Sequence, residues 1–344
     1  MRLDVVPENP LESFARAIGV LPTGVVKVIW SFAMARTLSA AVELGVFHAL
    51  KDGPRASSDL AQTLSCDREG MRTLCDALNG FGLLRRRDDV FTLTRESRRY
   101  LTDAHGSDFT DALRFGVVLD EKFRSLAHTV KTGEKQLFHD HLAPSEWDAY
   151  LGGLGAMATV VAGEVVRVLS LKNPTRLLDV AGGHGGFTRA MCKRHPTLRA
   201  TILDLPQAIV VGERLLADTD ERARIDFVAG DLRTTAWGEG HDVVFLFNIL
   251  HNLEEGDAKQ AVAQAHAALA PGGTLAVLEG QHAGGRGDLS FQEGFGELLF
   301  HVLSASMTWP TSTISTWMSE AGFSRVKTKS LFTLPGGVLL TSTK

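Results

Sequence analysis

The chain has 344 residues, which is enough for two domains of ordinary size. Hydrophobic residues make up 44% and charged residues 22%, which is typical of a globular protein with a sizeable core and excludes disordered and fibrous classes. The formal net charge is −4, so the chain lacks the basic excess of a protein whose main partner is nucleic acid.

The cysteines and the apolar segments indicate the compartment. Cys66, Cys75 and Cys192 are scattered and show no CxxC spacing, which favours reduced thiols over a disulfide framework or a thiolate metal site. Acids and prolines interrupt the N-terminal stretch where a signal peptide would be apolar. Apolar windows such as residues 243–250 are too short to cross a bilayer. We therefore expect a cytoplasmic protein with no membrane partner.

Residues 1–105 predict a helical domain that ends in a small hairpin. Apolar residues recur at helical spacing over residues 34–50, and two shorter helices follow, over residues 57–64 and from about residue 66 to Gly80. Two short β-runs within residues 83–94 then form a tight wing. A helix, a helix-turn-helix and a wing together make a winged helix.

A winged helix has two common uses, DNA binding and packing against a partner. Arg85, Arg86 and Arg87 could touch phosphates, but Asp88 and Asp89 follow them directly and the net charge is negative. We therefore favour a dimerisation scaffold, with a homodimer as the expected assembly and no nucleic-acid partner.

Residues 106–168 predict connecting helices over a substrate pocket, and residues 169–344 predict a doubly wound α/β domain. In that last domain short, nearly continuous β-runs alternate with helical stretches, which is typical of a sheet buried on both faces. The predicted strands are residues 176–182, 199–205, 224–231, 242–250, 273–280, 323–331 and 337–344.

A glycine-rich turn, residues 179–186 (DVAGGHGG), ends the first strand of this sheet. Glycines let the chain turn sharply and let a ligand approach the backbone before the next helix. NAD binding and a plain structural turn are alternatives. Asp179, Asp204 and Asp231, however, lie at the ends of the first three strands, where Asp204 could accept hydrogen bonds from ribose hydroxyls and Asp231 could meet an adenine amino group. This series favours a cationic nucleoside without phosphate, namely S-adenosylmethionine (SAM).

The motifs LLDVAGGHGG, TILDLPQAI, VAGDL and DVVFLFNILHNLEEGD, in this order behind a winged helix, resemble one family. It is the class I SAM-dependent family of small-molecule O-methyltransferases, comprising the plant caffeic-acid type and bacterial natural-product relatives. The resemblance implies a Rossmann-like seven-stranded sheet with an antiparallel last strand and an N-terminal dimerisation domain. With Asn248 added from the end of the fourth strand, the expected cofactor residues are Asp179, Gly182, Gly183, Asp204, Leu205, Asp231, Leu232 and Asn248.

The resemblance also implies catalytic residues. In the family a histidine after the fourth strand deprotonates a phenol, and that position is His251. An imidazole suits this task because its unperturbed pKa lies near neutrality. One of the two glutamates that orient the base falls on Glu279, but the second falls on Thr308, and Asn252 replaces the aspartate that follows the base.

These departures favour a second interpretation. Glu297 and His301 share one face of a predicted helix, and that segment forms the pocket wall opposite His251 in the family. His251 and His301 could together bind a transition metal such as iron or zinc. This resembles the metal-dependent 2-oxo acid C-methyltransferases of peptide-antibiotic pathways, where the metal would stabilise an enolate that attacks the methyl group. His301 could equally be an ordinary pocket-wall residue.

We favour metal-assisted C-methylation of a 2-oxo acid in natural-product metabolism. The alternative is O-methylation of an aromatic hydroxyl with His251 as general base. A winged-helix regulator that senses SAM is a third possibility, and DNA retardation at low salt would reveal it.

Overall fold

The computed structural model describes residues 9–20, 22–103, 108–280, 289–304 and 306–344. It divides the chain into two compact units, residues 1–117 and 118–344, and each is described here by itself. The domain boundaries expected from sequence, after residues 105 and 168, stay predictions.

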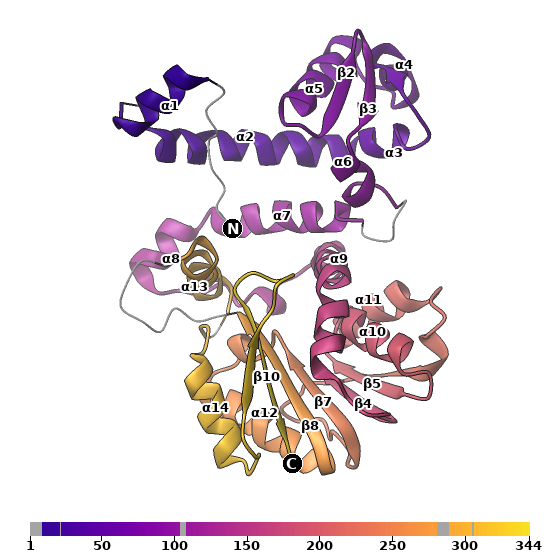
Figure 1. Ribbon diagram of the computed structural model, residues 1–344, viewed down its shortest axis with the longest axis vertical. Helices are drawn as coiled ribbons and strands as arrows, with labels where there is room; N and C mark the ends of the chain where they lie inside the picture. The colour runs from indigo at the N-terminus through magenta and orange to yellow at the C-terminus, as the bar shows by residue number, and fades with distance from the viewer. Residues whose placement is uncertain (1–8, 21, 104–107, 281–288, 305) are drawn as a thin grey trace. The chain divides into compact units, whose positions relative to one another are not determined.

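The first unit is a set of helices with a three-stranded sheet of order β1-β3-β2 (Figure 1). Its core is built from apolar side chains of α2 to α5 and of β2 and β3. Its elements are α1 (Pro10–Ala17), α2 (Thr23–Glu43), α3 (Val46–Ala49), β1 (Arg55–Ala56), α4 (Ser57–Thr63), α5 (Arg68–Gly80), β2 (Leu84–Arg87), β3 (Val90–Leu93) and α6 (Arg95–Tyr100), and α7 (Thr110–Phe123) crosses into the second unit.

The long helix expected over residues 34–50 is two helices. α2 ends at Glu43, and Gly45 takes a left-handed conformation with φ of 79° before α3 begins. Glycine adopts that region without steric penalty, so the chain turns here rather than continuing the helix. The two later helices and the wing of β2 and β3 lie where they were expected.

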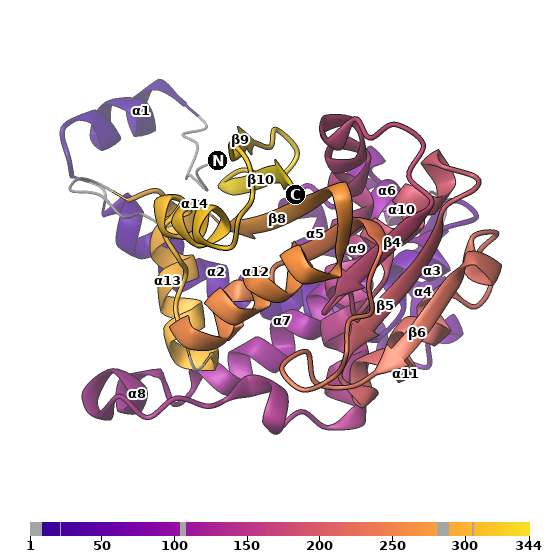
Figure 2. The ribbon, with the colours of Figure 1, turned by 90° about the horizontal axis from the view of Figure 1, so that it is seen from below.

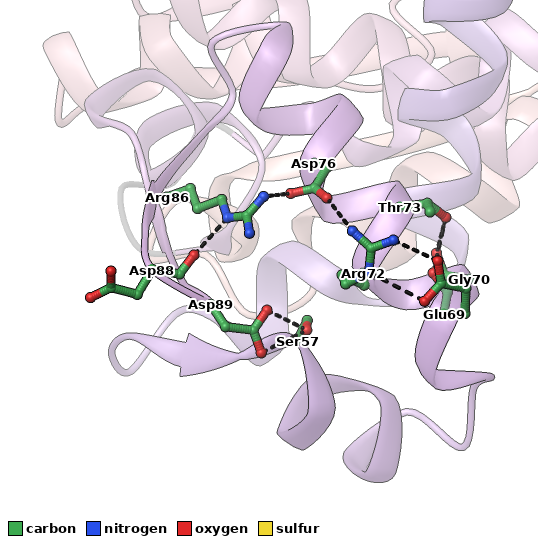
Figure 3. Close-up of polar contacts among 9 residues, drawn as sticks. All are labelled: Ser57, Glu69, Gly70, Arg72, Thr73, Asp76, Arg86, Asp88 and Asp89. Atoms are coloured by element: carbon green, nitrogen blue, oxygen red, sulfur yellow. Dashed lines mark hydrogen bonds and ion pairs between the residues drawn. The ribbon is translucent and has the colours of Figure 1, made fainter.

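An ion pair joins the wing to α5, where a second pair within the helix shares its carboxylate (Figure 3). Arg86 donates to Asp76 at 2.6 Å, and Asp76 also accepts from Arg72 at 3.0 Å. At the turn between β2 and β3, Asp89 accepts a hydrogen bond from Ser57 at 2.9 Å. The middle arginine of the 85–87 run is therefore engaged within the unit.

The second unit contains a seven-stranded sheet of order β6-β5-β4-β7-β8-β10-β9. The first five of these strands are parallel, whereas β10 runs antiparallel to both of its neighbours, β8 and β9 (Figure 2). The strands are β4 (Arg176–Val180), β5 (Arg199–Asp204), β6 (Ile225–Ala229), β7 (His241–Phe247), β8 (Leu269–Gly280), β9 (Lys327–Ser330) and β10 (Gly337–Thr343). This is the class I methyltransferase sheet predicted from the sequence.

Alternate residues of each strand supply two separate cores, one on each face of the sheet. Leu178 and Leu246 pack with α12 (Glu255–Ala268) and α14 (Thr311–Glu320), while Leu177 and Phe245 pack on the other face. Figure 1 shows that other face covered by α9 (Pro144–Leu169), α10 (Gly186–Arg194) and α11 (Pro206–Leu216). Burial on both faces explains why the strands appear in the sequence as continuous apolar runs.

The described part of this unit also contains the helices α8 (Leu126–Thr132) and α13 (Phe291–Leu303) and the short 3-10 turns η2 (Phe138–Asp140), η3 (Arg222–Arg224) and η4 (Leu250–Asn252). By length and composition α9 and residues Gly24–Glu43 of α2 could cross a membrane, which the sequence windows above overlooked. Core helices of soluble proteins meet the same criterion, and half of the α9 window is buried.

Candidate active site

The predicted cofactor residues gather at one edge of the parallel sheet. Asp179 lies near the end of β4, Asp204 ends β5, and Asp231 follows β6. Parallel strands place their carboxyl ends at the same edge, where ligands bind in open α/β sheets. The three acids and the glycine turn after β4 therefore share one rim.

Asp179 is a buried carboxylate with one oxygen unpaired. Its Oδ2 accepts a hydrogen bond from Thr188 at 2.5 Å, while Oδ1 is buried without a hydrogen-bond partner among the described residues. Burial raises the pKa of Asp179 to about 7, and the neighbouring charge of Asp204 adds to the shift. A buried acceptor without a partner is costly, so this oxygen fits a ligand that brings a donor or a positive charge.

Gly182 and Gly183, beside Asp179, occupy positions where the Cβ of any other residue would collide with a neighbouring side chain. A Cβ on Gly182 would lie 2.5 Å from the Asp179 Cγ, closer than atoms can approach. Gly183 has φ of +32°, and a Cβ there would lie 2.9 Å from a methyl group of Leu151. The turn thus keeps the backbone close to the carboxylate, as a site that holds a ligand against the chain requires.

Asp204 is fixed by the turn itself. Its Oδ2 accepts from the Gly183 N–H at 2.8 Å, and its Oδ1 accepts from the Leu205 N–H at 2.7 Å. Desolvation nevertheless raises the pKa of Asp204 to about 6. Leu205 precedes α11 and packs with Trp147 of α9.

The other two strand ends are more open. Asp231 is paired with Arg233, whose guanidinium lies 2.5 Å from its Oδ2, and this hydrogen bond lowers the pKa of Asp231. Leu232 is partly buried and accepts a hydrogen bond from Trp237 through its carbonyl. Asn248 is exposed just after β7, with a left-handed φ of 53°.

His251 and Glu279 form a buried pair at the next part of the rim. The Nδ1 of His251 lies 2.6 Å from Oε2 of Glu279, and Glu279 Oε1 accepts from the Leu250 N–H at 2.8 Å. Only 6% of His251 and 4% of Glu279 is exposed. Glu279 therefore fixes the imidazole with Nδ1 protonated, and Nε2 has no hydrogen-bond partner among the described residues.

Helix α13 and the segment after it cover this pair. The Phe300 ring lies 3.9 Å from the His251 ring between centroids, and Ser304 donates to Asn252 at 2.7 Å. Trp309 donates from Nε1 to the Leu250 carbonyl at 2.9 Å. Both residues that flank His251 are therefore tied to the segment that follows α13.

Two further histidines lie in this part of the fold, and the sequence did not assign them to the site. His139 of η2 lies beside Tyr150 of α9, with Nε2 and the hydroxyl 3.1 Å apart. His184, inside the glycine turn, accepts from the Gly186 N–H through Nδ1 at 2.9 Å, and burial lowers its pKa to about 4. His184 is thus an uncharged acceptor at the start of α10. His139 is more than a hundred residues from His251 in sequence, and no local spacing connects the two.

Comparison with known proteins identifies the family. The sequence model of the O-methyltransferase domain matches residues 120–324, and that of the O-methyltransferase dimerisation domain matches residues 26–103. The chain belongs to the O-methyltransferase family. It is therefore a SAM-dependent methyltransferase.

This methyltransferase is similar to bacterial and human methyltransferases. It is similar to the 3-hydroxy-5-methyl-1-naphthoate 3-O-methyltransferase of Streptomyces sahachiroi, with 28% identity over 85% of this chain and 87% of the relative. The mitomycin biosynthesis 6-O-methyltransferase of Streptomyces lavendulae is 26% identical over 81% and 82%. The structure of human N-acetylserotonin methyltransferase in complex with SAM matches with a TM-score of 0.82 at 21% identity, over 93% of this chain and 96% of that one.

The histidine pair expected to hold a metal in this methyltransferase is not formed. His251 is buried, whereas His301 is exposed, and the α13 residue that contacts His251 is Phe300. The described residues contain no group of three His, Cys, Asp or Glu side chains that could hold a metal ion. The two histidines that motivated metal-assisted C-methylation therefore do not form a metal site, and the two Streptomyces relatives named above are O-methyltransferases.

The structure shows what replaces the two family residues that this chain lacks near His251, a glutamate and an aspartate. Thr308, at the place of the second glutamate, donates a hydrogen bond to Glu297 at 2.7 Å, so α13 brings a carboxylate to that position. Asn252 is bound by Ser304 rather than by a charged partner. Neither departure requires a different reaction.

Proposed function

We propose that this enzyme transfers a methyl group from SAM to an aromatic hydroxyl of a small polycyclic natural product, with His251 as general base. The observation that carries the proposal is the buried hydrogen bond between His251 Nδ1 and Glu279, which leaves Nε2 without a partner among the described residues. This O-methylation, the alternative in the sequence analysis, replaces the metal-assisted reaction that we favoured there.

The residues present fit SAM. The unpaired Oδ1 of Asp179 suits the α-ammonium group, the Asp204 carboxylate suits the ribose hydroxyls, and Asp231 with Leu232 suits the adenine. Gly182 and Gly183 leave the backbone open beside these acids, and Leu205 and Asn248 flank them at the ends of β5 and β7. When bound, SAM supplies an electrophilic methyl group on a sulfonium.

His251 prepares the oxygen that receives this methyl group. Nε2 would take the proton of the substrate hydroxyl, and the electron pair of the broken O–H bond would stay on the oxygen. That pair would form the new bond to the methyl carbon as the bond from this carbon to sulfur breaks, which would leave S-adenosylhomocysteine as a neutral thioether. The imidazolium that results is stabilised by Glu279, which is itself held by the Leu250 N–H. Phe300 covers the ring and limits the access of water to it.

The substrate class comes from the relatives. Their names indicate a hydroxynaphthoate as one acceptor and a compound of mitomycin biosynthesis as the other, and both relatives are from Streptomyces. We extend to this enzyme a fused-ring acceptor with a free aromatic hydroxyl and a place in bacterial natural-product synthesis in the cytoplasm. The dimerisation-domain match supports a homodimer.

Methyl transfer to dihydroxynaphthalenes and to phenylpyruvate, each with and without a strong chelator, tests the proposal. We expect O-methylated naphthalenes in yields that the chelator does not change. His251→Ala should lower kcat/KM at least a hundredfold, which is the usual contribution of a general base.

His301→Ala is the matched control, because that side chain is exposed on α13 and should leave kcat/KM within about twofold. Chelator-sensitive methylation of phenylpyruvate that is lost in His301→Ala would overturn the proposal and restore the metal enolate reaction.

A further inference from the structure

The segment before α9 lies against the same part of α13 that covers His251. The Gln136 N–H donates to the Val302 carbonyl at 3.0 Å, and Lys135 Nζ donates to the Ser306 carbonyl at 3.2 Å. Val302 is two residues beyond Phe300, whose ring packs on His251. The chain that leads into η2 therefore starts at the end of α13, two residues from the phenylalanine that contacts the proposed catalytic base.

His139 of η2 extends from there towards the cofactor residues. Its Nε2 lies 3.1 Å from the Tyr150 hydroxyl, and its ring centroid lies 5.8 Å from that of Trp147. Tyr150 and Leu205 both pack against the buried apolar cluster that contains Trp147, and Leu205 directly follows Asp204. His139 thus contacts α9 residues that pack near the end of β5, and it is close enough to His251 for the two charges to interact.

The surroundings keep His139 uncharged. Desolvation, together with the nearby His251, lowers its pKa to about 4. Burial raises the pKa of Tyr150, so this phenol stays protonated. A neutral imidazole with so low a pKa is a poor acceptor for a phenol proton, and its remaining use is as a neutral hydrogen-bonding group.

The hydrogen bond to Tyr150 determines which ring nitrogen of His139 can donate a hydrogen bond to a substrate. A phenol is a better donor than a neutral imidazole N–H, so Tyr150 donates to Nε2 and the ring proton resides on Nδ1. This Nδ1–H has no hydrogen-bond partner among the described residues, where the hydrogen bond of His139 is made through Nε2.

We propose that the Nδ1–H of His139 binds a second oxygen substituent of the substrate while the hydroxyl to be methylated lies at Nε2 of His251. The preferred acceptor is then a phenol that carries another hydroxyl, carbonyl or carboxylate oxygen on its ring system. This inference rests on the proposed O-methylation and adds to it a residue that selects the substrate. His251 takes a proton, whereas His139 stays neutral and only donates a hydrogen bond. The oxygen at His251 is therefore methylated and the oxygen at His139 is not.

Binding to the enzyme loaded with S-adenosylhomocysteine tests this role without turnover. Dissociation constants are measured by calorimetry for 2-naphthol and for the 2,3-, 2,6- and 2,7-dihydroxynaphthalenes. We expect at least one diol to bind about tenfold more tightly than 2-naphthol, the usual contribution of one added hydrogen bond. His139→Phe, which keeps a ring beside Trp147, should abolish that preference while leaving 2-naphthol affinity within about twofold.

His139→Asn is the rescue variant, because its amide N–H lies close to the place of Nδ1, and it should restore part of the preference. A merely structural role would weaken all four ligands together in His139→Phe. That result would overturn the inference. A diol preference that is unchanged in His139→Phe would overturn it too, and so would a wild-type enzyme that binds all four ligands equally. Failure of the wild type to methylate any naphthol would instead count against the proposed function.

Discussion

Two buried acids on the sheet rim link cofactor binding to pH. Burial raises the pKa of Asp179 to about 7 and that of Asp204 to about 6, so both are largely protonated in the free enzyme at pH 5. A ligand ammonium and ribose hydroxyls favour the ionised forms, so binding releases protons and strengthens as pH rises. We predict that the dissociation constant of S-adenosylhomocysteine falls at least tenfold from pH 5 to pH 7.

Calorimetry in buffers of different ionisation enthalpy measures both the affinity and the released protons. Asp204→Asn should weaken binding and flatten its pH dependence. Asp231→Asn is the control: Arg233 already lowers the pKa of that carboxyl, so the variant should change affinity by the same factor at both pH values. Equal wild-type affinity at pH 5 and pH 7 would show that the two acids do not titrate on binding.

The raised pKa values of Asp179 and Asp204 also determine how the free energy of unfolding of the free enzyme changes with pH. Between the unfolded value near 3.8 and the raised native values, the folded state binds more protons than the unfolded state. The free energy of unfolding contributed by Asp179 and Asp204 therefore falls as pH rises from about 4 to 7. We predict that the rise in Tm caused by S-adenosylhomocysteine is larger at pH 7 than at pH 5, as scanning calorimetry can measure.

Gly182 permits the close approach of the backbone to Asp179. The Cβ of Gly182→Ala would fall 2.5 Å from the Asp179 Cγ, so either the carboxylate or the turn must move. We predict a loss of S-adenosylhomocysteine affinity of more than tenfold, measured by calorimetry. Gly256→Ala in the first turn of α12 meets no atom within 4 Å, so it should keep full affinity and gain roughly 0.5–1 kcal/mol of stability. Unchanged binding by Gly182→Ala would mean that the ligand does not depend on this turn.

Among elements, a carboxylate of α9 binds the segment between β9 and β10 and adds to the apolar packing of this helix on the sheet. Glu164 accepts from the Phe332 N–H at 2.9 Å and from the Thr333 N–H at 2.7 Å, in the segment between β9 and β10. The hydroxyl of Thr333 and these N–H groups lower the pKa of Glu164 to about 2. Its stabilisation is thus fully present above pH 4.5 and is lost as pH falls towards 2.

Glu164→Gln should therefore lower the Tm by a few degrees at pH 7, because an amide group would face two donors, and the difference from wild type should shrink below pH 4.5. Glu213→Gln is the matched control, since its exposed contact with Arg222 at 3.5 Å contributes little. Scanning calorimetry from pH 3.5 to pH 7 measures both. If the Tm difference between Glu164→Gln and wild type does not change with pH, the stabilisation does not come from the charge of Glu164.

The strands of the second unit could be predicted from the pattern of apolar residues in the sequence, whereas the contacts between distant segments could not. Strands buried on both faces leave continuous apolar runs, so β4 to β8 and the acids at their ends could be predicted. The spacing of Glu297 and His301 established only that they share a helix face, and it is Phe300 that turns towards His251. His139 reaches the site through η2 and α9, and that meeting is set by tertiary packing, which leaves no local signal in the sequence.

At the scale of the whole molecule, α2 carries apolar side chains that its own unit does not cover. Val28, Ile29 and Phe32 are each more than 60% exposed, and only 12% of the apolar window of this helix is buried. A soluble monomer rarely leaves such a surface open, and the helix lies mostly within residues 26–103, which match the dimerisation domain. A second copy of the chain is therefore the expected partner.

We predict a particle of twice the chain mass in light scattering after size exclusion, without detergent. The double variant Ile29→Glu, Phe32→Glu should dissociate it to the mass of one chain. Val210→Glu on α11, also well exposed at 68%, is the control and should remain dimeric because it lies outside this surface. A wild type that binds lipid vesicles and stays monomeric in their absence would instead make α2 a membrane contact, since its length and apolar composition meet that requirement as well.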